Sequence, residues 1–247
     1  MDFIAREQPE VFALQEVNQT AAAPLLGEIP AGYFPCSGNG VPLKADNHAA
    51  AVARMLEERG VQYHWSWLPA KIGYDKYDEG MAVFSRAPIT AAKSAAEQVR
   101  RLQQLEDPPR LGICAGDVWY YTVHLLVEGR SGTFCRPVGN AVPGGRRKKD
   151  RLSAGGLQQR GRRAGRGLRP CAPQRLAGHL PSGTAADEGY TVVQAIDGWR
   201  DAPDAAAKKR IDQIWCSKTV PVKSSRVVFN GLREPQVSDH AGVLIEL

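Results

Sequence analysis

Short apolar runs alternate with polar stretches that contain Gly or Pro along most of the chain. The run Val11–Leu14 has the length and composition of a buried strand. The alanine-rich stretch Lys44–Arg59 predicts a helix that starts at Asp46 and Asn47 and stops at Gly60. A short helix is expected at Phe3–Glu7, closed by Pro9. Further strands are expected at Val61–Trp67, Met81–Ser85, Val118–Leu125, Arg210–Cys216, Val222–Phe229 and Gly242–Glu246. Pro69 and Pro88 mark the ends of the first two of these strands. Strands that alternate with helix predict an α/β protein (α+β in some schemes) around a buried sheet.

Residues 126–186 break this pattern. The stretch Leu125–Ala186 holds 13 Lys or Arg against 2 Asp or Glu, and the whole chain has a net charge of +6, so the remaining residues carry −5. Its runs GRRKKD and QQRGRRAGRG are typical of disordered or low-complexity chain, and Phe134 is its single aromatic residue. A surface built to bind nucleic acid usually combines basic and aromatic side chains, so this segment does not favour one. We expect one domain over residues 1–247, with an anomalous basic segment at 126–186.

The composition sets the broad class. A chain of 247 residues with 43% hydrophobic and 23% charged residues is typical of a soluble globular protein with a real core. It has no run of eighteen apolar residues, and its first ten residues carry charge where a signal peptide would be apolar. The five cysteines are scattered without a C-x-x-C pair, which disfavours a disulfide scaffold or a Cys-type zinc site. We therefore expect a cytoplasmic protein without a membrane partner, and the sequence does not indicate an oligomeric state.

Several carboxylates and histidines stand next to apolar strands. A charged group beside a core strand needs a partner because its desolvation is costly, and ligands of α/β proteins bind near strand ends. Five such positions in one small domain predict a shared site. They are Glu16, the pair Asp78-Glu79, His124, Asp212 and the pair Asp239-His240.

Each position also has a structural explanation when it is taken alone. Glu16 would then cap a loop, Asp78 and Glu79 would be turn residues before a glycine, and His124 would be a satisfied core histidine. Asp212 is harder to explain in this way, because apolar residues flank it on both sides. The functional interpretation therefore depends on the five positions acting together.

Together, these groups favour phosphoester chemistry with a hard metal ion. Glu16 and Asp239 offer oxygen ligands that suit Mg²⁺, with Mn²⁺ as the alternative, and Mg²⁺ usually takes only one or two carboxylates. A histidine held by a buried aspartate, such as His240 with Asp212, can orient or activate an attacking water, or meet a phosphate oxygen. The cation would offset charge that develops on the phosphoryl oxygens.

Five motifs, in this order and at this spacing, resemble the endonuclease/exonuclease/phosphatase superfamily. They are PEVFALQEVNQ (9–19), YDEGMAVFSRAPI (77–89), WYYTVHL (119–125), KRIDQIWC (209–216) and VSDHAGVLIEL (237–247). Residues 44–80 are similar to the bacterial subgroup that includes maltose 6′-phosphate phosphatase. The resemblance implies a four-layer α/β sandwich with two packed central sheets, incomplete here across 126–186, and Mg²⁺-dependent hydrolysis of a phosphate ester.

The resemblance also implies roles for individual residues. Glu16 in LQEVNQ would be the principal metal ligand, and Asp239 in SDH would lie near the metal. His240 would be the catalytic histidine, with Asp212 in RIDQIW as its orienting partner. The two remaining residues, Glu79 and His124, would line the phosphate side of the pocket.

Two elements of the family are missing. Its first strand, which ends in an Asn near the metal, would lie upstream of Met1. Its Gly-Asp-Phe-Asn element, which supplies an Asp for the nucleophile and an Asn for the phosphate, is expected between His124 and Asp212. No Gly-Asp-x-Asn occurs there.

A shifted reading frame would explain why this element is absent. Codons can be chosen for Gly155–Arg160 that read Gly-Asp-Phe-Asn-Asn when started one base later, and four family-like fragments arise at the same offset within 126–186. We hypothesise an indel after Leu125 and a compensating one near Ala186. The nucleotide sequence of the gene tests this, because a second frame that does not encode Gly-Asp-Phe-Asn-Asn contradicts it. The alternative is a family member with a divergent insertion.

Three functions follow from these observations. The first is a phosphatase for a sugar phosphate or a similar small phosphomonoester, with impaired activity in this chain. The second is a nuclease of the same superfamily, which should present a positive groove to its substrate. The net negative charge outside 125–186 favours the small phosphorylated substrate over nucleic acid. The third is a non-catalytic remnant or a basic binding module.

Overall fold

The computed structural model describes residues 1–94, 110–115, 118–123, 151–156, 174–175, 189–192, 208–216 and 222–247. These residues fall into two compact units, and each is described by itself. Unit 1 holds the described residues from 1 to 123, and unit 2 holds those from 174 to 247. Strand β7 (Arg151–Gly156) crosses the boundary between the units. The single domain expected over 1–247 stays a prediction.

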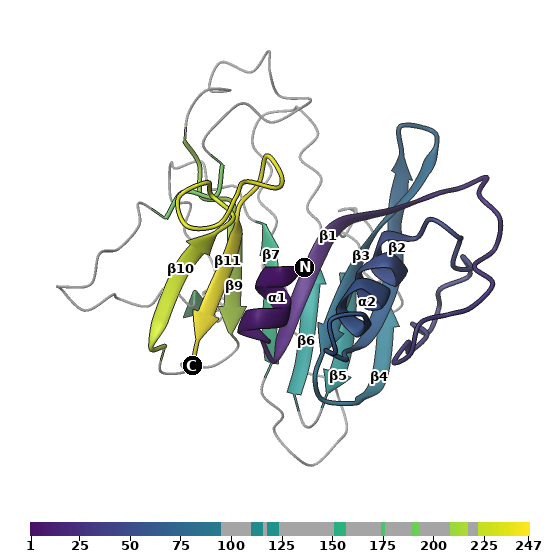
Figure 1. Cartoon of the computed structure of the whole chain (residues 1–247), viewed down its shortest axis with the longest axis horizontal. Coiled ribbons are helices and arrows are strands. Elements are labelled where there is room, and N and C mark those ends of the chain that lie inside the picture. Colours follow the sequence, from purple (N-terminus) through teal and green to yellow (C-terminus); the bar gives the residue numbers. More distant parts are fainter. Residues whose placement is uncertain are drawn as a thin grey trace, which may run out of the picture. The chain divides into compact units, whose positions relative to one another are not determined.

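Unit 1 is built on a sheet of three long strands. After helix α1 (Asp2–Glu7) come β1 (Val11–Thr20), β2 (His64–Gly73) and β3 (Tyr77–Ser85), and β3 lies in the middle, antiparallel to both neighbours. Helix α2 (His48–Glu57) lies against one face of this sheet (Figure 1). Trp65, Trp67 and Phe84 of the sheet and Leu56 of the helix are almost fully buried in this layer.

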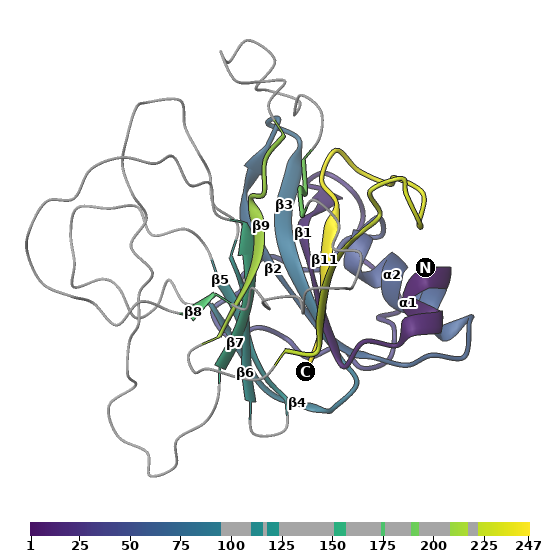
Figure 2. The same ribbon diagram turned by 90° about the vertical axis from the view of Figure 1, so that its left-hand side faces the viewer.

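A second antiparallel sheet packs on the opposite face. Its first three strands are β4 (Ile89–Ser94), β5 (Arg110–Ala115) and β6 (Val118–Val123), with β5 between the other two. Successive side chains of a strand point to opposite faces, so Met81 and Val83 of β3 pack with Leu111 and Ile113 of β5. Figure 2 shows helix, first sheet and second sheet as successive layers. The structure is thus sheet-rich α+β with packed sheets, which confirms the predicted fold class.

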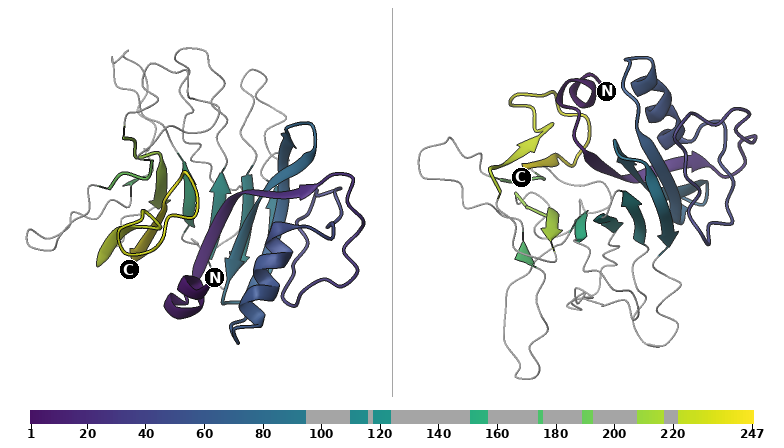
Figure 3. Two further views of the ribbon diagram at one scale, coloured as in Figure 1. Left: turned by 45° about the horizontal axis from the view of Figure 1, so that its top comes forward. Right: turned by 90° about the horizontal axis from the view of Figure 1, so that it is seen from below.

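Unit 2 contains two antiparallel strand pairs. β8 (Gln174–Arg175) pairs with β9 (Asp212–Cys216), and β10 (Ser224–Val228) pairs with β11 (Gly242–Glu246). β10 and β11 lie side by side in both views of Figure 3. β11 also contacts β9, and this contact brings the start of β9 near the residues that precede β11.

Most predicted elements are confirmed, but several differ in extent. The expectation that Pro69 ends its strand is wrong, since β2 continues to Gly73. β2 is an edge strand, and its register shifts between Pro69 and Lys71, so the missing N–H of proline is tolerated there. β4 and β5 were not among the predicted strands. β7 and β8 lie within 126–186, where no structure was expected, and the other residues of that segment lie outside the described residues.

The side chain of Gln19 fixes the loop between β1 and α2. Its Nε2 donates to Oδ2 of Asp78 at 2.9 Å and to the carbonyl of Pro42 at 3.0 Å. Its Oε1 accepts from Nδ2 of Asn47 at 2.9 Å and from the backbone N–H of Lys44 at 3.0 Å. Two donated and two accepted hydrogen bonds satisfy a primary amide completely. Gln19 can therefore be buried, at 1% exposure, without an unpaired polar atom.

Helix α2 starts at His48 because Asn47 caps it, in agreement with the start predicted at Asp46 and Asn47. Oδ1 of Asn47 accepts from the backbone N–H of Ala50 at 3.0 Å. The neighbouring Asp46 accepts from the backbone N–H of Thr20 at 3.1 Å. Burial raises the pKa of Asp46, but the hydrogen bonds with Thr20 and with its own backbone N–H, together with the charge of His48, lower it by more, so this pKa lies below its ordinary value.

Asn47→Ala should lower the free energy of unfolding by about 2 kcal/mol, because it removes both the cap and the bond to the buried Gln19. Asn47→Ser keeps a capping oxygen and should lose only about half as much. Urea unfolding followed by tryptophan fluorescence measures both values. Equal losses for the two substitutions would show that the cap contributes nothing.

Candidate functional site

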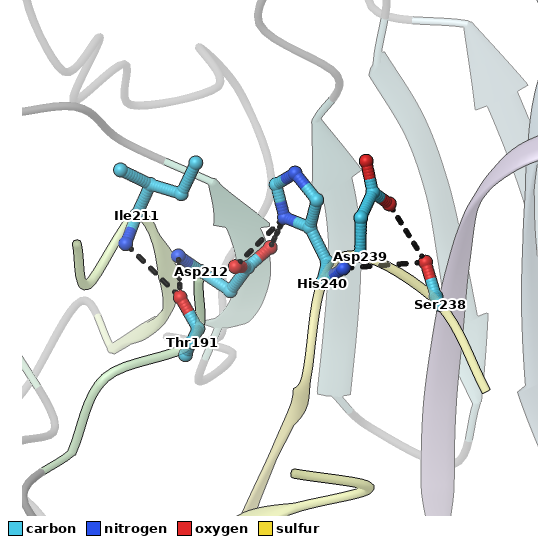
Figure 4. A network of polar contacts seen from close by, with 6 residues as sticks. All are labelled: Thr191, Ile211, Asp212, Ser238, Asp239 and His240. Atoms are coloured by element: carbon cyan, nitrogen blue, oxygen red, sulfur yellow. Dashed lines mark hydrogen bonds and ion pairs between the residues drawn. The ribbon is translucent and has the colours of Figure 1, made fainter. Parts of the chain in front are cut away.

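Asp212 and His240 form a hydrogen-bonded pair in unit 2. Nδ1 of His240 lies 3.1 Å from Oδ1 and 3.0 Å from Oδ2 of Asp212 (Figure 4). Asp212 is the first residue of β9, and His240 lies two residues before β11. Both side chains are partly buried, at 20% and 34% exposure, so the pair is sheltered while its histidine remains accessible.

Thr191 holds the backbone around this pair. Its Oγ1 accepts from the backbone N–H groups of Ile211 at 3.1 Å and Asp212 at 3.2 Å (Figure 4). Its carbonyl accepts from the N–H of Ala241 at 2.7 Å. Thr191 is 1% exposed and therefore links the two segments that carry Asp212 and His240 from inside unit 2.

Asp239 lies beside His240 but binds a different group. Oγ of Ser238 donates to Oδ1 of Asp239 at 3.0 Å and accepts from the backbone N–H of His240 at 3.3 Å. Figure 4 shows the Asp239 carboxylate turned to Ser238, on the side of His240 away from Asp212. Unit 2 thus presents the imidazole of His240 hydrogen-bonded to the carboxylate of Asp212, with the separate carboxylate of Asp239 next to it.

The geometry of the pair determines which nitrogen of His240 can react. A carboxylate at Nδ1 favours the tautomer or the cation with a proton on Nδ1, so Nε2 is the atom that can accept or donate a proton. Nε2 points away from Asp212 in Figure 4. This arrangement can activate a water or protonate an oxygen, as in other histidine–aspartate pairs.

Glu16 occupies a β-bulge in unit 1. Leu14 pairs with Ala82 and Val17 with Gly80, so Gln15 and Glu16 both stand opposite one residue of β3. Glu16 has a φ of 54°, a left-handed conformation that costs a residue with a Cβ roughly 1–2 kcal/mol. The expectation that Glu16 follows its strand is therefore wrong, since β1 continues past it to Thr20. Bulges and strained residues concentrate near active sites, where they direct a side chain.

The surroundings of Glu16 leave its carboxylate accessible. The residue is exposed, and within the described part of the chain no hydrogen bond or ion pair involves its carboxylate. It borders a groove of about 300 Å³ between β1 and α2, where His48 and the apolar residues Leu14, Val52 and Met55 also lie.

Glu79 is buried in unit 1 as half of an ion pair. Its Oε1 lies 2.9 Å from Nζ of Lys71, and its side chain is 6% exposed. It belongs to β3 and not to a turn before the strand, so the expected position of Asp78 and Glu79 ahead of the strand is wrong. A Cβ on Gly73 would lie 2.6 Å from Oε2 of Glu79, which shows that the glycine provides the space for this carboxylate.

Within each unit, the structure brings some of the predicted site residues together. It pairs Asp212 with His240, places Asp239 next to them, and places Glu16 and Glu79 on adjacent strands of unit 1. His124 lies outside the described residues. The convergence of all six residues on one pocket stays a prediction.

Sequence reasoning missed Thr191 and Lys71. Thr191 lies in a short polar and apolar stretch without a recognisable pattern, and only its hydrogen bonds reveal its role. Lys71 could have been found from the buried Glu79, because a buried carboxylate needs a cationic partner.

The available oxygen donors fit a hard divalent cation. Among the described residues, the Glu16 carboxylate has no hydrogen-bond or ion-pair partner, and the Asp239 carboxylate accepts from Ser238, so both retain lone pairs. Carboxylates with free lone pairs are donors of the kind that Mg²⁺ takes, alongside several waters. The described residues contain no group of three His, Cys, Asp or Glu side chains close enough to hold a metal by themselves.

Comparison with known families identifies the class of this protein. Residues 1–164, about two thirds of the chain, match the Endonuclease/Exonuclease/phosphatase family, and the chain belongs to this family. Members of the family are phosphoester hydrolases that generally use divalent metal ions. No curated protein matches the chain. No helix among the described residues is long and apolar enough to cross a membrane.

Solved structures share the fold at low sequence identity. An endonuclease/exonuclease/phosphatase family protein from Leptotrichia buccalis is 23% identical with a TM-score of 0.58, and the match covers 99% of this chain and 90% of that one. A protein of the same description from Beutenbergia cavernae is 16% identical with a TM-score of 0.53, covering 99% and 64%. TDP2 from Caenorhabditis elegans is 12% identical with a TM-score of 0.50, covering 98% and 65%.

Proposed function

We propose that this chain is a phosphatase-type hydrolase of the family, dependent on Mg²⁺ or Mn²⁺, that acts on a sugar phosphate or a similar small phosphomonoester. The observation that carries the proposal is the Asp212–His240 pair, which holds an imidazole at 3.0 Å from a carboxylate and leaves Nε2 directed away from it. The similarity of residues 44–80 to the maltose 6′-phosphate phosphatase subgroup supports the sugar phosphate.

In this proposal, His240 moves the proton. Nε2 accepts it from the attacking water, or donates to a phosphoryl oxygen, while Asp212 keeps Nδ1 protonated and the ring oriented. Glu16 and Asp239 would hold the metal, which offsets the charge on the phosphoryl oxygens when bound. The scattered cysteines support a reducing cytoplasm as its compartment.

Glu79 and His124 would line the phosphate side of the pocket. A buried carboxylate alone would repel a phosphate, but Nζ of Lys71 at 2.9 Å from Glu79 offsets that charge. The ammonium also offers further N–H donors, of the kind that bind phosphoryl oxygens.

The distribution of charge favours a phosphatase over a nuclease. A nuclease needs a positive surface to bind the phosphates of its substrate. The excess of positive charge in this chain lies in 125–186. The remainder, which carries all six proposed site residues, is net negative. A small phosphorylated substrate needs no extended positive groove.

We further propose that activity is impaired in the chain as written. No Gly-Asp-x-Asn occurs between His124 and Asp212, so the Asp and Asn expected from the family resemblance are absent. Loss of catalytic groups that act as a unit usually costs orders of magnitude in rate. The shifted reading frame over 126–186 is the proposed cause, and the gene sequence tests it directly.

The full chain should release phosphate from small phosphomonoesters at least about 10³-fold more slowly than the median enzyme turnover of about 10 s⁻¹. The release should need Mg²⁺ and stop when a chelator is added. A phosphate assay with sorbitol 6-phosphate, with and without the chelator, measures both. A normal rate would refute the impairment, release that resists the chelator would refute the metal dependence, and cleavage of DNA in preference to the small ester would favour the nuclease.

A further inference from the structure

Three polar side chains form a row across the first sheet of unit 1. Asn18 of β1 and Lys71 of β2 both pair in register with Glu79 of β3, the middle strand (Figure 1). Residues that stand opposite each other on adjacent strands share a face of the sheet, with Cβ atoms about 5 Å apart. We call Asn18, Glu79 and Lys71 the polar row.

The polar row lies at the border of the apolar layer between the two sheets. Glu79 shares its face of β3 with Met81 and Val83, which are buried against the second sheet. Glu16 stands in the bulge of β1 only two residues before Asn18. The row is therefore a local feature of unit 1, next to the residue proposed as metal ligand.

Asn18 has an acceptor that the protein does not satisfy. Its Oδ1 is buried and has no hydrogen-bond partner among the described residues. A buried carbonyl without a partner costs free energy, so such groups in native proteins call for an explanation. Gln19, the next residue, has all its amide bonds made, which shows that the local fold can satisfy a buried amide.

The charges of the row restrict what can bind to Asn18. Lys71 and Glu79 are ion-paired at 2.9 Å, so the row is neutral overall and has no excess negative charge to attract a cation. A phosphate dianion offers only acceptors and cannot donate to Oδ1. A neutral hydroxyl group can donate to Oδ1 and also accept from a nearby donor.

We infer that Asn18 is a specificity-determining residue that accepts a hydrogen bond from a hydroxyl of the alcohol part of the phosphate ester. This inference rests on the proposed phosphatase function and narrows its substrates to hydroxyl-bearing esters, such as phosphates of sugars and polyols. A site that hydrogen-bonds a substrate hydroxyl rejects the analogue that lacks it, because its own polar group is then left unpaired.

Binding to the full chain tests the inference without requiring turnover. Sorbitol 6-phosphate and n-hexyl phosphate have the same carbon chain and phosphate but differ in their hydroxyl groups. Titration calorimetry in the presence of Mg²⁺ should give the wild-type chain at least 10-fold higher affinity for sorbitol 6-phosphate. Asn18→Leu should lower that affinity at least 10-fold and change the affinity for hexyl phosphate less than 3-fold. Asn18→Asp, which keeps an acceptor of the same size, should retain the preference for the polyol ester.

The possible outcomes separate this inference from the proposed function. Binding of both esters without preference by the wild-type chain, or an equal loss for both in Asn18→Leu, overturns the role of Asn18 and leaves the phosphatase proposal standing. Failure of both esters to bind to the wild-type chain overturns the two together. Should Asn18→Leu fail to fold, Asn18→Ala, which also lacks the acceptor but is smaller, makes the same comparison, and an undiminished preference for the polyol ester in that variant overturns the role of Asn18.

Discussion

A chain whose residues 126–186 are re-encoded in the shifted frame should release phosphate from a small phosphomonoester at least about 10³-fold faster than the chain as written. In that background His240→Ala should remove most of the gain, about 10²–10⁴-fold, because proton transfer by a positioned histidine contributes this much. A phosphate assay with sorbitol 6-phosphate and Mg²⁺ measures both steps. The expected gain reflects the return of the Asp and Asn of the Gly-Asp-Phe-Asn element.

Asp212→Asn should reduce the rate nearly as strongly as His240→Ala. The substitution keeps the size of the side chain but presents an amide to Nδ1 of His240, so neither the tautomer nor the imidazolium is stabilised. His64→Ala provides a matched control, since it removes another partly exposed imidazole, from an edge strand of unit 1, and should change the rate less than 3-fold. A re-encoded chain that retains full activity without His240 would remove the basis of the proposed function.

Gly80→Ala should lower the free energy of unfolding by about 3 kcal/mol. A Cβ at this position would lie 2.5 Å from the carbonyl oxygen of Leu68 and 2.7 Å from Nε1 of Trp67. Trp67 is fully buried, and its Nε1 donates to the carbonyl of Val17 at 3.0 Å, so it cannot move aside without losing that bond. Urea unfolding measured by tryptophan fluorescence should show the loss.

Gly27→Ala is the control for this substitution. A Cβ on Gly27 would meet nothing within 4 Å, so the change in stability should stay below about 0.5 kcal/mol. If Gly80→Ala lowers the free energy of unfolding no more than Gly27→Ala does, the sheet accommodates a Cβ at Gly80 without strain.

The position of Gly80 also connects stability to the candidate site. Gly80 pairs with Val17 on one side and Pro69 on the other, and the register shifts next to it on both neighbouring strands. Glu16 lies in one of these irregularities, and Lys71 follows the other. Crowding at Gly80 is therefore expected to disturb the bulge that carries Glu16 as well as the core.

The local elements of this protein could be predicted because they depend on neighbouring residues. The helix stop at Gly60, the cap at Asn47 and the strand at Gly242–Glu246 each follow from a few adjacent side chains. Strand boundaries were less predictable, because pairing with β3 extends β1 past Glu16 and β2 past Pro69.

By itself, the sequence determined the family through its motifs and proposed Asp212 and His240 as partners 28 positions apart. Only the tertiary structure decided that these two side chains meet at hydrogen-bonding distance, that Thr191 supports them, and that Lys71 neutralises Glu79. The physical reason is the separation along the sequence over which each effect acts. Propensity and periodicity act between adjacent residues, whereas an ion pair or a bulge depends on which strand becomes the neighbour, and that choice is made by packing of the whole sheet.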